Sequence, residues 1–280
     1  MRIVEEVSAL RHQLRAWRRA GESISFVPTM GNLHEGHLRL VREARRADRV
    51  VVSIFVNPLQ FGPNEDFANY PRTLNEDCEK LRNERATLLF APSPEILYPE
   101  GEPTMRVQAG ALAERLCGLH RPGHFDGVAT IVAKLFNLVQ PDIAVFGKKD
   151  YQQLAVIKQL VHQLNFPVDI IGVDTAREAD GLAMSSRNQY LSPEDRQIAP
   201  QLYAALQQIA AAVMSGRRDY PVLQTNAIKA LKKSGWQPDY VKICRPQDLA
   251  PANEQDAQLV ILAAGRLGTT RLIDNLEFAI

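Results

Sequence analysis

Two histidines lie three residues apart in a turn that also contains glycine. The stretch PTMGNLHEGHLRLV covers residues 28–41 and places Gly36 between His34 and His37. A zinc protease helix needs His-Glu-x-x-His, so that both imidazoles lie on one face. Here the spacing is one residue shorter, and histidines that only pack or cap are the ordinary alternative. Phosphate binding fits better, because a helix N-terminus exposes unpaired N–H groups and the positive end of its dipole.

The residues around this turn predict a strand before it and a helix after it. ISFV, residues 24–27, reads as a short buried strand. After the turn, apolar Leu38, Leu40 and Val41 alternate with charged residues in the pattern of an amphipathic helix. The sequence therefore predicts a strand, a turn and the start of a helix.

Two further segments carry groups suited to phosphate. In FGKKDYQQL, residues 146–154, Lys149 follows a predicted strand and Asp150 can cap the next helix. In DGLAMSSRNQYLS, residues 180–192, two hydroxyls and a guanidinium are adjacent, which suits the gripping of phosphate oxygens. A solvated lysine pair and a polar surface loop are the alternatives for these two segments. The residues of the second segment that we single out are Ser185, Ser186 and Arg187.

A fourth segment offers neutral amides instead of charge. VNPLQFGPNEDFANYPR, residues 56–72, presents Asn57 and Gln60 just after a predicted buried strand, with Tyr70 further along. Amides in such a position can bind the hydroxyl and carboxylate of a small molecule without adding charge. The segment therefore predicts a binding site for a small polar substrate.

Strand-like and helix-like patterns alternate through the first part of the chain. Because the strands are apolar throughout, they indicate a parallel sheet with helices on both faces. Ligands of such sheets bind at the carboxyl ends of the strands, where three of the segments above lie. The predicted class is α/β, with a Rossmann-like, doubly wound parallel sheet. The strands are expected at 24–27, 50–56, 86–92, 142–147 and 168–173, and further helices at 74–85, 128–139 and 151–164.

The strict alternation ends near residue 176. We predict an N-terminal domain of residues 1–175 and a smaller α+β C-terminal domain of residues 176–280, joined near 174–179. Residues 1–21 are expected to form an amphipathic helix. The second domain is expected to contain helices at 193–214 and 222–234 and strands at 240–245, 258–265 and 270–275.

Composition narrows the class of protein. The chain has 280 residues and a net charge of +1, which argues against bulk attraction to nucleic acid or to an anionic membrane. No apolar run approaches the length of a membrane span. Cys78, Cys117 and Cys244 are far apart and in no metal or disulfide spacing, which suits a reducing compartment. The sequence predicts a cytoplasmic protein with no nucleic-acid or membrane partner.

The chain resembles the pantoate–β-alanine ligase family of the nucleotidyltransferase superfamily, whose signature is a His-x-Gly-His turn. The resemblance runs essentially from end to end, and five matches in the same order make it specific. The matching stretches are PTMGNLHEGH, VVSIFVNPLQFG, YPRTLNED, RPGHFDGVATIVAKLFNLVQPDIAVFGKKDYQQL and DGLAMSSRNQYLS.

The resemblance implies a ligation in two steps. Pantoate attacks the α-phosphorus of ATP to give pantoyl adenylate and pyrophosphate, and β-alanine then displaces AMP to give pantothenate. It also implies catalytic roles for His34, His37 and Lys149, with His37 as the proton donor. ATP is a substrate, Mg²⁺ assists, and the protein is expected to be a homodimer with a C-terminal lid domain.

The resemblance assigns binding residues as well. Gln60 and Gln153 are expected to bind pantoate, Gln60 to touch β-alanine too, and Asn57 and Tyr70 to complete the substrate site. Asp77 is a candidate Mg²⁺ contact. The expected ATP-binding residues are Met30, Gly31, Asn32, Leu33, His34, Glu35, Gly36, His37, Gly147, Lys148, Lys149, Asp150, Ala176, Met184, Ser185, Ser186 and Arg187.

One position departs from the family pattern. The family reads Gly-Glu-Lys-Asp where this chain has Gly-Lys-Lys-Asp, so Lys148 replaces a glutamate. Since Lys149 and Asp150 are present, we expect activity to persist. Two rivals stay open at this point: an adenylyltransferase acting on a phosphorylated acceptor, and a nucleotide-binding module without activity.

Overall fold

The computed structural model describes residues 1–63 and 65–280. The chain divides into two compact units. Unit 1 comprises residues 1–148 and 156–174, and unit 2 comprises residues 149–155 and 175–280.

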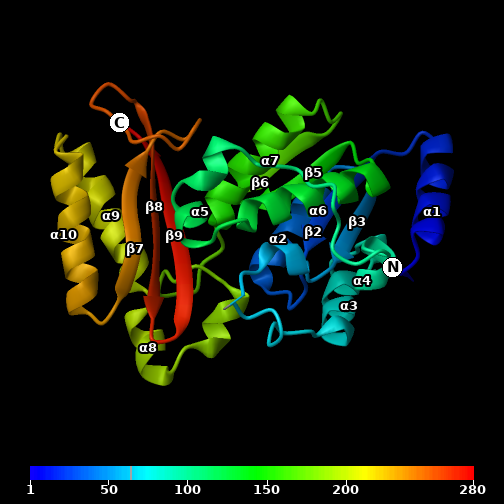
Figure 1. The fold of residues 1–280 in the computed structure, drawn as a ribbon, viewed down its shortest axis with the longest axis horizontal. Coiled ribbons are helices and arrows are strands. Elements are labelled where there is room, and N and C mark those ends of the chain that lie inside the picture. Colours follow the sequence, from blue (N-terminus) through cyan, green and yellow to red (C-terminus); the bar gives the residue numbers. More distant parts are fainter. Residues whose placement is uncertain (64) are drawn as a thin grey trace. The chain divides into compact units, whose positions relative to one another are not determined.

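Unit 1 is built on a parallel sheet. Within the described ranges it has six strands in the order β1-β4-β3-β2-β5-β6, and every neighbouring pair is parallel. Figure 1 labels β2, β3, β5 and β6 of this sheet. The reversal of strand order beside β2 is typical of a doubly wound sheet. The strands are β1 (Arg2–Val4), β2 (Ile24–Thr29), β3 (Arg49–Ile54), β4 (Leu88–Phe90), β5 (Ile143–Gly147) and β6 (Asp169–Val173).

Helices connect these strands, as parallel pairing requires. The last helix of the series, α7 (Tyr151–Gln163), begins in unit 2 and continues in unit 1. The others are α1 (Val7–Arg19), α2 (Glu35–Ala44), α3 (Leu74–Asn83), α4 (Pro94–Leu97), α5 (Cys117–His120) and α6 (His124–Val139), with short 3₁₀ helices η1 (Pro58–Gln60) and η2 (Ala111–Glu114). A third 3₁₀ helix, η3 (Lys148–Asp150), begins at the last residue of the first segment of unit 1 and continues in unit 2.

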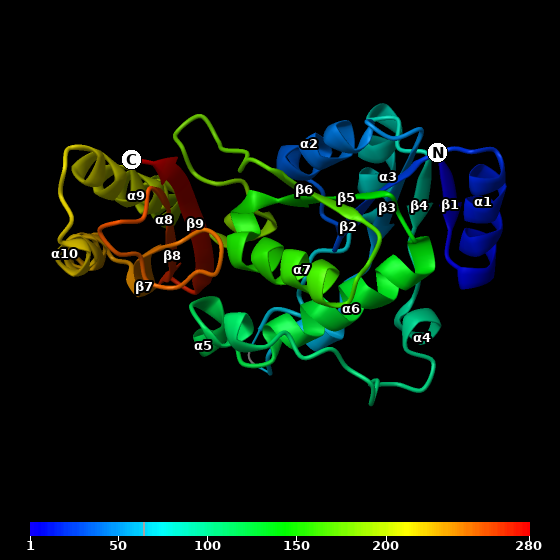
Figure 2. The same cartoon turned by 90° about the horizontal axis from the view of Figure 1, so that it is seen from above.

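The central strands β2, β3, β4 and β5 are largely buried on both faces, which explains why most of their residues are apolar. Successive side chains of a strand point to opposite faces. Val27 of β2 packs in one core cluster with Val41 of α2 and Leu81 of α3. Its neighbour Phe26 instead meets Phe136 of α6 edge to face, at 6.5 Å between ring centroids. Figure 2 shows α2 and α3 on one side of the sheet and α6 on the other.

Unit 2 contains a three-stranded antiparallel sheet in the order β7-β8-β9. Its core joins this sheet to two long helices through residues such as Leu206, Leu231 and Ile261. The elements are η4 (Ser186–Tyr190), α8 (Pro193–Ile198), α9 (Gln201–Met214), α10 (Tyr220–Lys233), β7 (Gln237–Cys244), β8 (Gln258–Leu267) and β9 (Thr270–Ala279).

The predicted fold class is confirmed, and two predicted elements are corrected. Residues 2–4, predicted as part of a helix, form β1, which pairs with β4. An edge strand offers unpaired backbone groups, and β-branched Ile3 and Val4 suit a strand that pairs there. The helix predicted at 193–214 is interrupted at Pro200, because proline lacks the N–H that a continuous helix needs. Among the described residues, no helix is long and apolar enough to cross a membrane.

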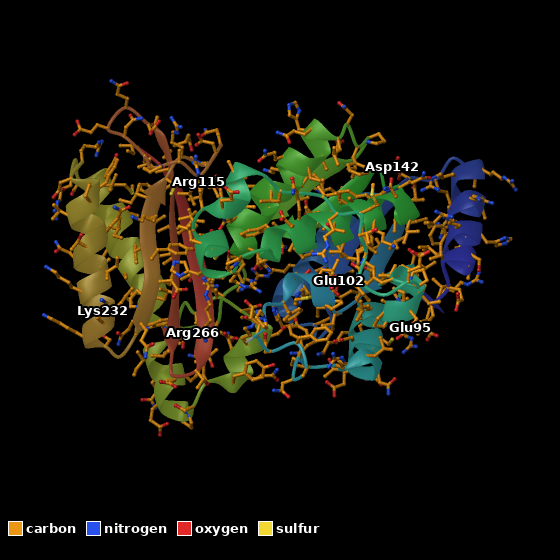
Figure 3. All side chains as sticks on the ribbon, viewed as in Figure 1. Glu95, Glu102, Arg115, Asp142, Lys232 and Arg266 are labelled. Atoms are coloured by element: carbon orange, nitrogen blue, oxygen red, sulfur yellow. The ribbon has the colours of Figure 1, made fainter. Side chains whose placement is uncertain are left out.

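Two long-range contacts of unit 1 fix the starts of β2 and α6. At the start of β2, the N–H of Ile24 donates to Asp142 Oδ2 at 2.7 Å, and Figure 3 labels this aspartate. At the start of α6, Gly127 lies against η1. A Cβ added to Gly127 would lie 2.2 Å from the Leu59 carbonyl oxygen, so the helix approaches η1 this closely only because the residue is glycine.

We therefore expect Gly127→Ala to separate α6 from η1. The added Cβ meets backbone atoms that cannot rotate away, so overpacking should destabilise the protein by about 1–3 kcal/mol. Urea denaturation of the two proteins measures this difference. Gly62→Ala is a matched control, because its Cβ would meet only Glu65 side-chain atoms at 3.7–3.8 Å. Equal midpoints for the two variants would contradict the close contact.

Candidate active site

The turn after β2 has an unusual backbone. Gly31 and Asn32 have φ values of +82° and +49°, a region that favours glycine and tolerates asparagine. A Cβ on Gly31 would also lie 3.0 Å from Ile54 Cγ2. Thr29 braces the first part of the turn, because its hydroxyl donates to the Ser53 carbonyl at 2.8 Å and accepts the Gly31 N–H at 3.2 Å. The motif therefore needs a glycine at residue 31 for two independent reasons.

The second part of the turn is bound by one buried carboxylate. Asp77 of α3 is 0% exposed. Its Oδ2 accepts the N–H of Asn32 at 2.8 Å, and its Oδ1 accepts the N–H of Leu33 at 2.7 Å. Lys80, one turn further along α3, donates to the Leu33 carbonyl at 2.8 Å. Helix α3 thus satisfies the N–H groups of Asn32 and Leu33 and the carbonyl of Leu33.

These contacts bear on the expectation that Asp77 binds Mg²⁺. Both of its oxygens accept backbone N–H groups, and the Thr73 hydroxyl donates to Oδ2 as well at 3.2 Å. Residues 1–63 and 65–280 contain no group of three or more histidine, cysteine, aspartate or glutamate side chains that could hold a metal ion. The geometry favours a structural role for Asp77, and its expected metal contact stays a prediction.

The two histidines cap the N-terminus of α2. His34 is the cap residue, and its Nδ1 accepts the Gly36 N–H at 3.1 Å. His37 reaches back, and its Nδ1 accepts the His34 N–H at 3.3 Å. The ring centroids lie 4.1 Å apart. A neutral imidazole that accepts at Nδ1 carries its proton on Nε2, so this capping places the proton of a neutral His34 or His37 ring on Nε2.

Glu35 lies between these histidines in sequence, and its side chain is paired with arginine. It forms an ion pair with Arg42 along α2, and Arg42 also binds Glu84, with 2.9 Å between Nε and Oε2. The hydrogen bond from Arg42 lowers the pKa of Glu35. Because its carboxylate is ionised and bound to arginine, Glu35 adds no unpaired negative charge to the turn.

The amide of Gln60 lies beside this turn in unit 1. Gln60 is 8% exposed, and its Nε2 donates to Met30 Sδ at 3.0 Å. Its Oε1 accepts from Asn57 Nδ2 at 3.2 Å. Asn57 also donates to the Gly127 carbonyl at 3.1 Å, and its Oδ1 accepts from the Tyr98 hydroxyl at 2.9 Å. Asn57 is therefore occupied by protein groups and orients Gln60.

Two basic residues that were not predicted from the sequence contact the backbone carbonyl of Gln60. His124 Nδ1 is 2.7 Å from the Gln60 carbonyl oxygen, and Arg121 donates to the same oxygen at 3.3 Å. Arg121 also pairs with both oxygens of Glu65, at 2.6 and 2.5 Å. The signal was present in RPGHFDGV, where two basic residues and a glycine precede an apolar helix, as in the first motif.

Tyr70, expected in the substrate site, is buried in an aromatic cluster of unit 1. Its exposed fraction is 6%. Its ring meets Phe61 edge to face at 5.8 Å between centroids. The tyrosine therefore packs on the residue that follows η1, and a substrate contact stays a prediction.

Lys148 forms an ion pair within unit 1. Its Nζ lies 2.9 Å from Asp174 Oδ1, and the aspartate side chain is 89% exposed. Gly147 pairs with Val173 at the carboxyl ends of β5 and β6. The lysine that departs from the family pattern thus has a partner at the end of the neighbouring strand.

Unit 2 contributes Lys149, Asp150 and Gln153 from one short segment. Lys149 is 21% exposed, and its Nζ lies 3.9 Å from Asp150 Oδ2. Its backbone carbonyl accepts from Asn275 Nδ2 of β9 at 2.9 Å. Gln153 is half-buried in the first turn of α7.

Unit 2 also contains the predicted serine and arginine loop. Ser185 Oγ accepts the Arg187 N–H at 3.2 Å, which starts η4. The loop follows a narrow hairpin in which the Met184 N–H donates to the Ala176 carbonyl at 2.9 Å. Ala176 and Met184 are therefore adjacent, and Ser185, Ser186 and Arg187 continue from them.

The structure thus groups the predicted residues in two sets. In unit 1 the turn from Met30 to His37 contacts Gln60, which in turn contacts Asn57. In unit 2 the hairpin of Ala176 and Met184 leads directly into the serine and arginine loop. Each set offers neutral or cationic donors, which suits a ligand rich in phosphate oxygens.

Comparison with known proteins identifies the family. The family model described as pantoate-beta-alanine ligase matches residues 2–277. The chain is 52% identical to the pantothenate synthetase of Alcanivorax borkumensis over 281 aligned positions, covering 100% of this chain and 99% of the relative.

Solved structures agree with this match. Pantothenate synthetase from Thermus thermophilus is 48% identical and superposes with a TM-score of 0.90, covering 99% of each chain. Pantoate-beta-alanine ligase from Francisella tularensis, complexed with beta-gamma ATP and beta-alanine, is 34% identical with a TM-score of 0.83, covering 99% of this chain and 97% of that one. With a motif-bearing turn, a confirmed fold and end-to-end similarity, the chain belongs to the pantoate–β-alanine ligase family.

Proposed function

We propose that this ligase, which joins pantoate and β-alanine with ATP, works through a pantoyl adenylate. In the first step a pantoate carboxylate oxygen bonds to the α-phosphorus of ATP, and pyrophosphate leaves. In the second step the β-alanine nitrogen bonds to the acyl carbon, AMP leaves, and the amine loses a proton. Both steps require positioned groups that stabilise negative charge on oxygen.

The observation that carries this proposal is the pair of capping histidines. Each Nδ1 accepts a backbone N–H, so each neutral ring has its proton on Nε2. We assign His37 Nε2–H, with His34 beside it, to the phosphate oxygens as charge accumulates during transfer. The backbone of residues 30–37 would bind ATP at the N-terminus of α2, where anions are stabilised.

The groups of unit 2 are assigned to the rest of the nucleotide. Lys149 and Arg187 would neutralise phosphate charge, with the hydroxyls of Ser185 and Ser186 donating hydrogen bonds. The backbone of residues 147–150, together with Ala176 and Met184, would contact the ribose and adenine. Support comes from the hairpin, which joins Ala176 directly to the residue before the serine pair.

Pantoate is assigned to the amides of Gln60 and Gln153, and β-alanine to Gln60 as well. Gln60 suits this role because Asn57, Met30 and His124 fix its side chain and its carbonyl. Asn57 would act on the substrate through Gln60. The contact of Tyr70 with the substrate stays a prediction.

The described residues do not build a protein cage for Mg²⁺. The carboxylate of Asp77 binds backbone N–H groups, and no cluster of metal-binding side chains accompanies it. Mg²⁺ is usually bound through substrate phosphates and water with few protein ligands. We therefore propose that Mg²⁺ arrives with ATP, where it would neutralise phosphate charge.

Other expectations stay predictions. These are a homodimer, a lid role for residues 176–280, and the absence of nucleic-acid and membrane partners. A cytoplasmic location is proposed because the three cysteines stand in no disulfide spacing.

Pyrophosphate–ATP exchange tests the adenylate directly. We expect exchange that requires pantoate and proceeds without β-alanine, because the formation of the adenylate and its reversal exchange pyrophosphate without the second step. His37→Ala should lower the exchange rate by about 10²-fold to 10⁴-fold, on the scale of losing a positioned catalytic group. Circular dichroism checks that the variant is folded. Near-normal exchange in folded His37→Ala would remove this residue from the mechanism, and exchange with a phosphorylated acceptor instead of pantoate would favour the rival adenylyltransferase.

The departure from the family pattern at Lys148 leads to a further prediction. Lys148→Glu restores the residue that the family pattern leads us to expect, and it places a carboxylate near Asp174. Because Asp174 is 89% exposed, salt and water screen the repulsion to about 1 kcal/mol or less. We expect the KM for ATP to change by less than about fivefold, measured by steady-state kinetics at two ionic strengths. A change above about tenfold that disappears in high salt would show that this position tunes nucleotide binding.

A further inference from the structure

Strand β9 contacts both segments that unit 2 contributes to the proposed ATP site. Side chains at successive positions of a strand point to opposite faces, so neighbouring residues can bind different partners. Asn275 donates to the carbonyl of Lys149 at 2.9 Å. Asp274 binds Arg177, the residue after Ala176, on its other side.

The contact through Asn275 fixes the segment that carries Lys149. Asn275 is 6% exposed, so its amide is withdrawn from water and its hydrogen bond is protected from competition. Two residues further on, and therefore on the same face of β9, Glu277 Oε1 accepts the Tyr151 hydroxyl at 2.8 Å. Strand β9 therefore binds the residues before and after Asp150, namely Lys149 and Tyr151.

The contact through Asp274 fixes the hairpin that leads to the serine and arginine loop. Arg177 donates to both Asp274 oxygens, at 2.7 and 2.9 Å. The guanidinium also donates to the Gly181 carbonyl at 3.0 Å, and its central carbon lies 3.4 Å from the centroid of the Tyr203 ring. The Arg177 guanidinium is thereby held by a carboxylate, a backbone carbonyl and an aromatic ring.

Arg177 transmits this restraint to the loop through the hairpin itself. Arg177 and Ala183 form an isolated antiparallel β-bridge, and the Met184 N–H donates a hydrogen bond to the Ala176 carbonyl. Ser185, Ser186 and Arg187 follow at once. Burial raises the pKa of Asp274, while Arg177 and the Lys149 ammonium oppose that rise, so the two segments also share an electrostatic partner.

We propose that Asp274 and Asn275 of β9 are positioning residues that hold Lys149 and the serine and arginine loop in a fixed mutual arrangement for ATP. This inference rests on the proposed assignment of those two segments to the nucleotide. The physical reason is that nucleotidyl transfer depends on placement, and an error of about 1 Å costs about 10²-fold in rate. Neither residue touches the substrate in this account; each acts through a backbone carbonyl or through Arg177.

A double-mutant cycle tests the role of Asn275. Asn275→Ala should lower pantoate-dependent pyrophosphate exchange by about tenfold. Lys149→Ala should lower it more, and the double variant should equal Lys149→Ala alone, because residues that act as one unit are not additive. If Asn275→Ala does not fold, Asn275→Ser removes the amide with a smaller change in polarity.

Gln224→Ala is the matched control. Gln224 Oε1 accepts the Ile243 N–H at 2.8 Å, so this variant also loses one side chain to backbone hydrogen bond within unit 2. We expect a comparable loss of melting temperature and an unchanged exchange rate. Hydrogen-exchange mass spectrometry should show faster amide exchange at residues 147–154 in Asn275→Ala and wild-type exchange there in Gln224→Ala.

The outcomes separate this inference from the proposed function. Unchanged amide exchange at 147–154 in Asn275→Ala, or fully additive rate losses in the double variant, would overturn it. A wild-type rate in Lys149→Ala would instead overturn the proposed role of that lysine.

A second double-mutant cycle tests the role of Asp274. Asp274→Asn keeps the shape of the side chain and weakens the bond to Arg177, so it should lower the pantoate-dependent exchange rate. This loss should be smaller in an Arg187→Ala background, where only the serine hydroxyls of the loop remain. Additivity in that pair would overturn this half of the proposal.

Discussion

The turn that follows β2, which we propose binds ATP, depends on its hydrogen bonds to the carboxylate of Asp77. This carboxylate lies on α3, yet both of its oxygens bind backbone N–H groups of the turn that follows β2. Asn32 has a positive φ, a conformation that most non-glycine residues avoid and that asparagine tolerates. A fully buried carboxylate is itself unfavourable unless donors surround it. The turn and the carboxylate therefore stabilise each other, and neither would be stable in this form alone.

The same arrangement recurs at the other proposed site residues. Asn57 and His124 fix Gln60, and Asn275 fixes the carbonyl of Lys149. In each case a buried or half-buried polar side chain contacts a neighbouring residue and holds it in one orientation. Transfer chemistry that relies on positioned donors needs this rigidity more than it needs reactive groups.

Sequence patterns predicted the elements whose signals are local. The apolar strands and the turn with His34 and His37 follow from short-range periodicity and spacing. Strand β1 was missed because its formation depends on pairing with β4, and the break at Pro200 was underestimated although proline is a local signal. The supporting contacts were also missed. Asp77 lies 44 and 45 residues from its partners in the turn, and Asn275 lies 126 residues from Lys149, so no local pattern reveals them.

The most direct test of this account measures adenylate formation in Asp77→Asn. The substitution keeps the shape but replaces one acceptor with an N–H donor that faces a backbone N–H. Asp142→Asn is the control, because Asp142 accepts a backbone N–H at the opposite end of β2. We expect single-turnover adenylation to fall by about tenfold or more in folded Asp77→Asn and to stay near wild type in Asp142→Asn. A wild-type rate in folded Asp77→Asn would contradict the claim that this carboxylate shapes the turn proposed to bind ATP.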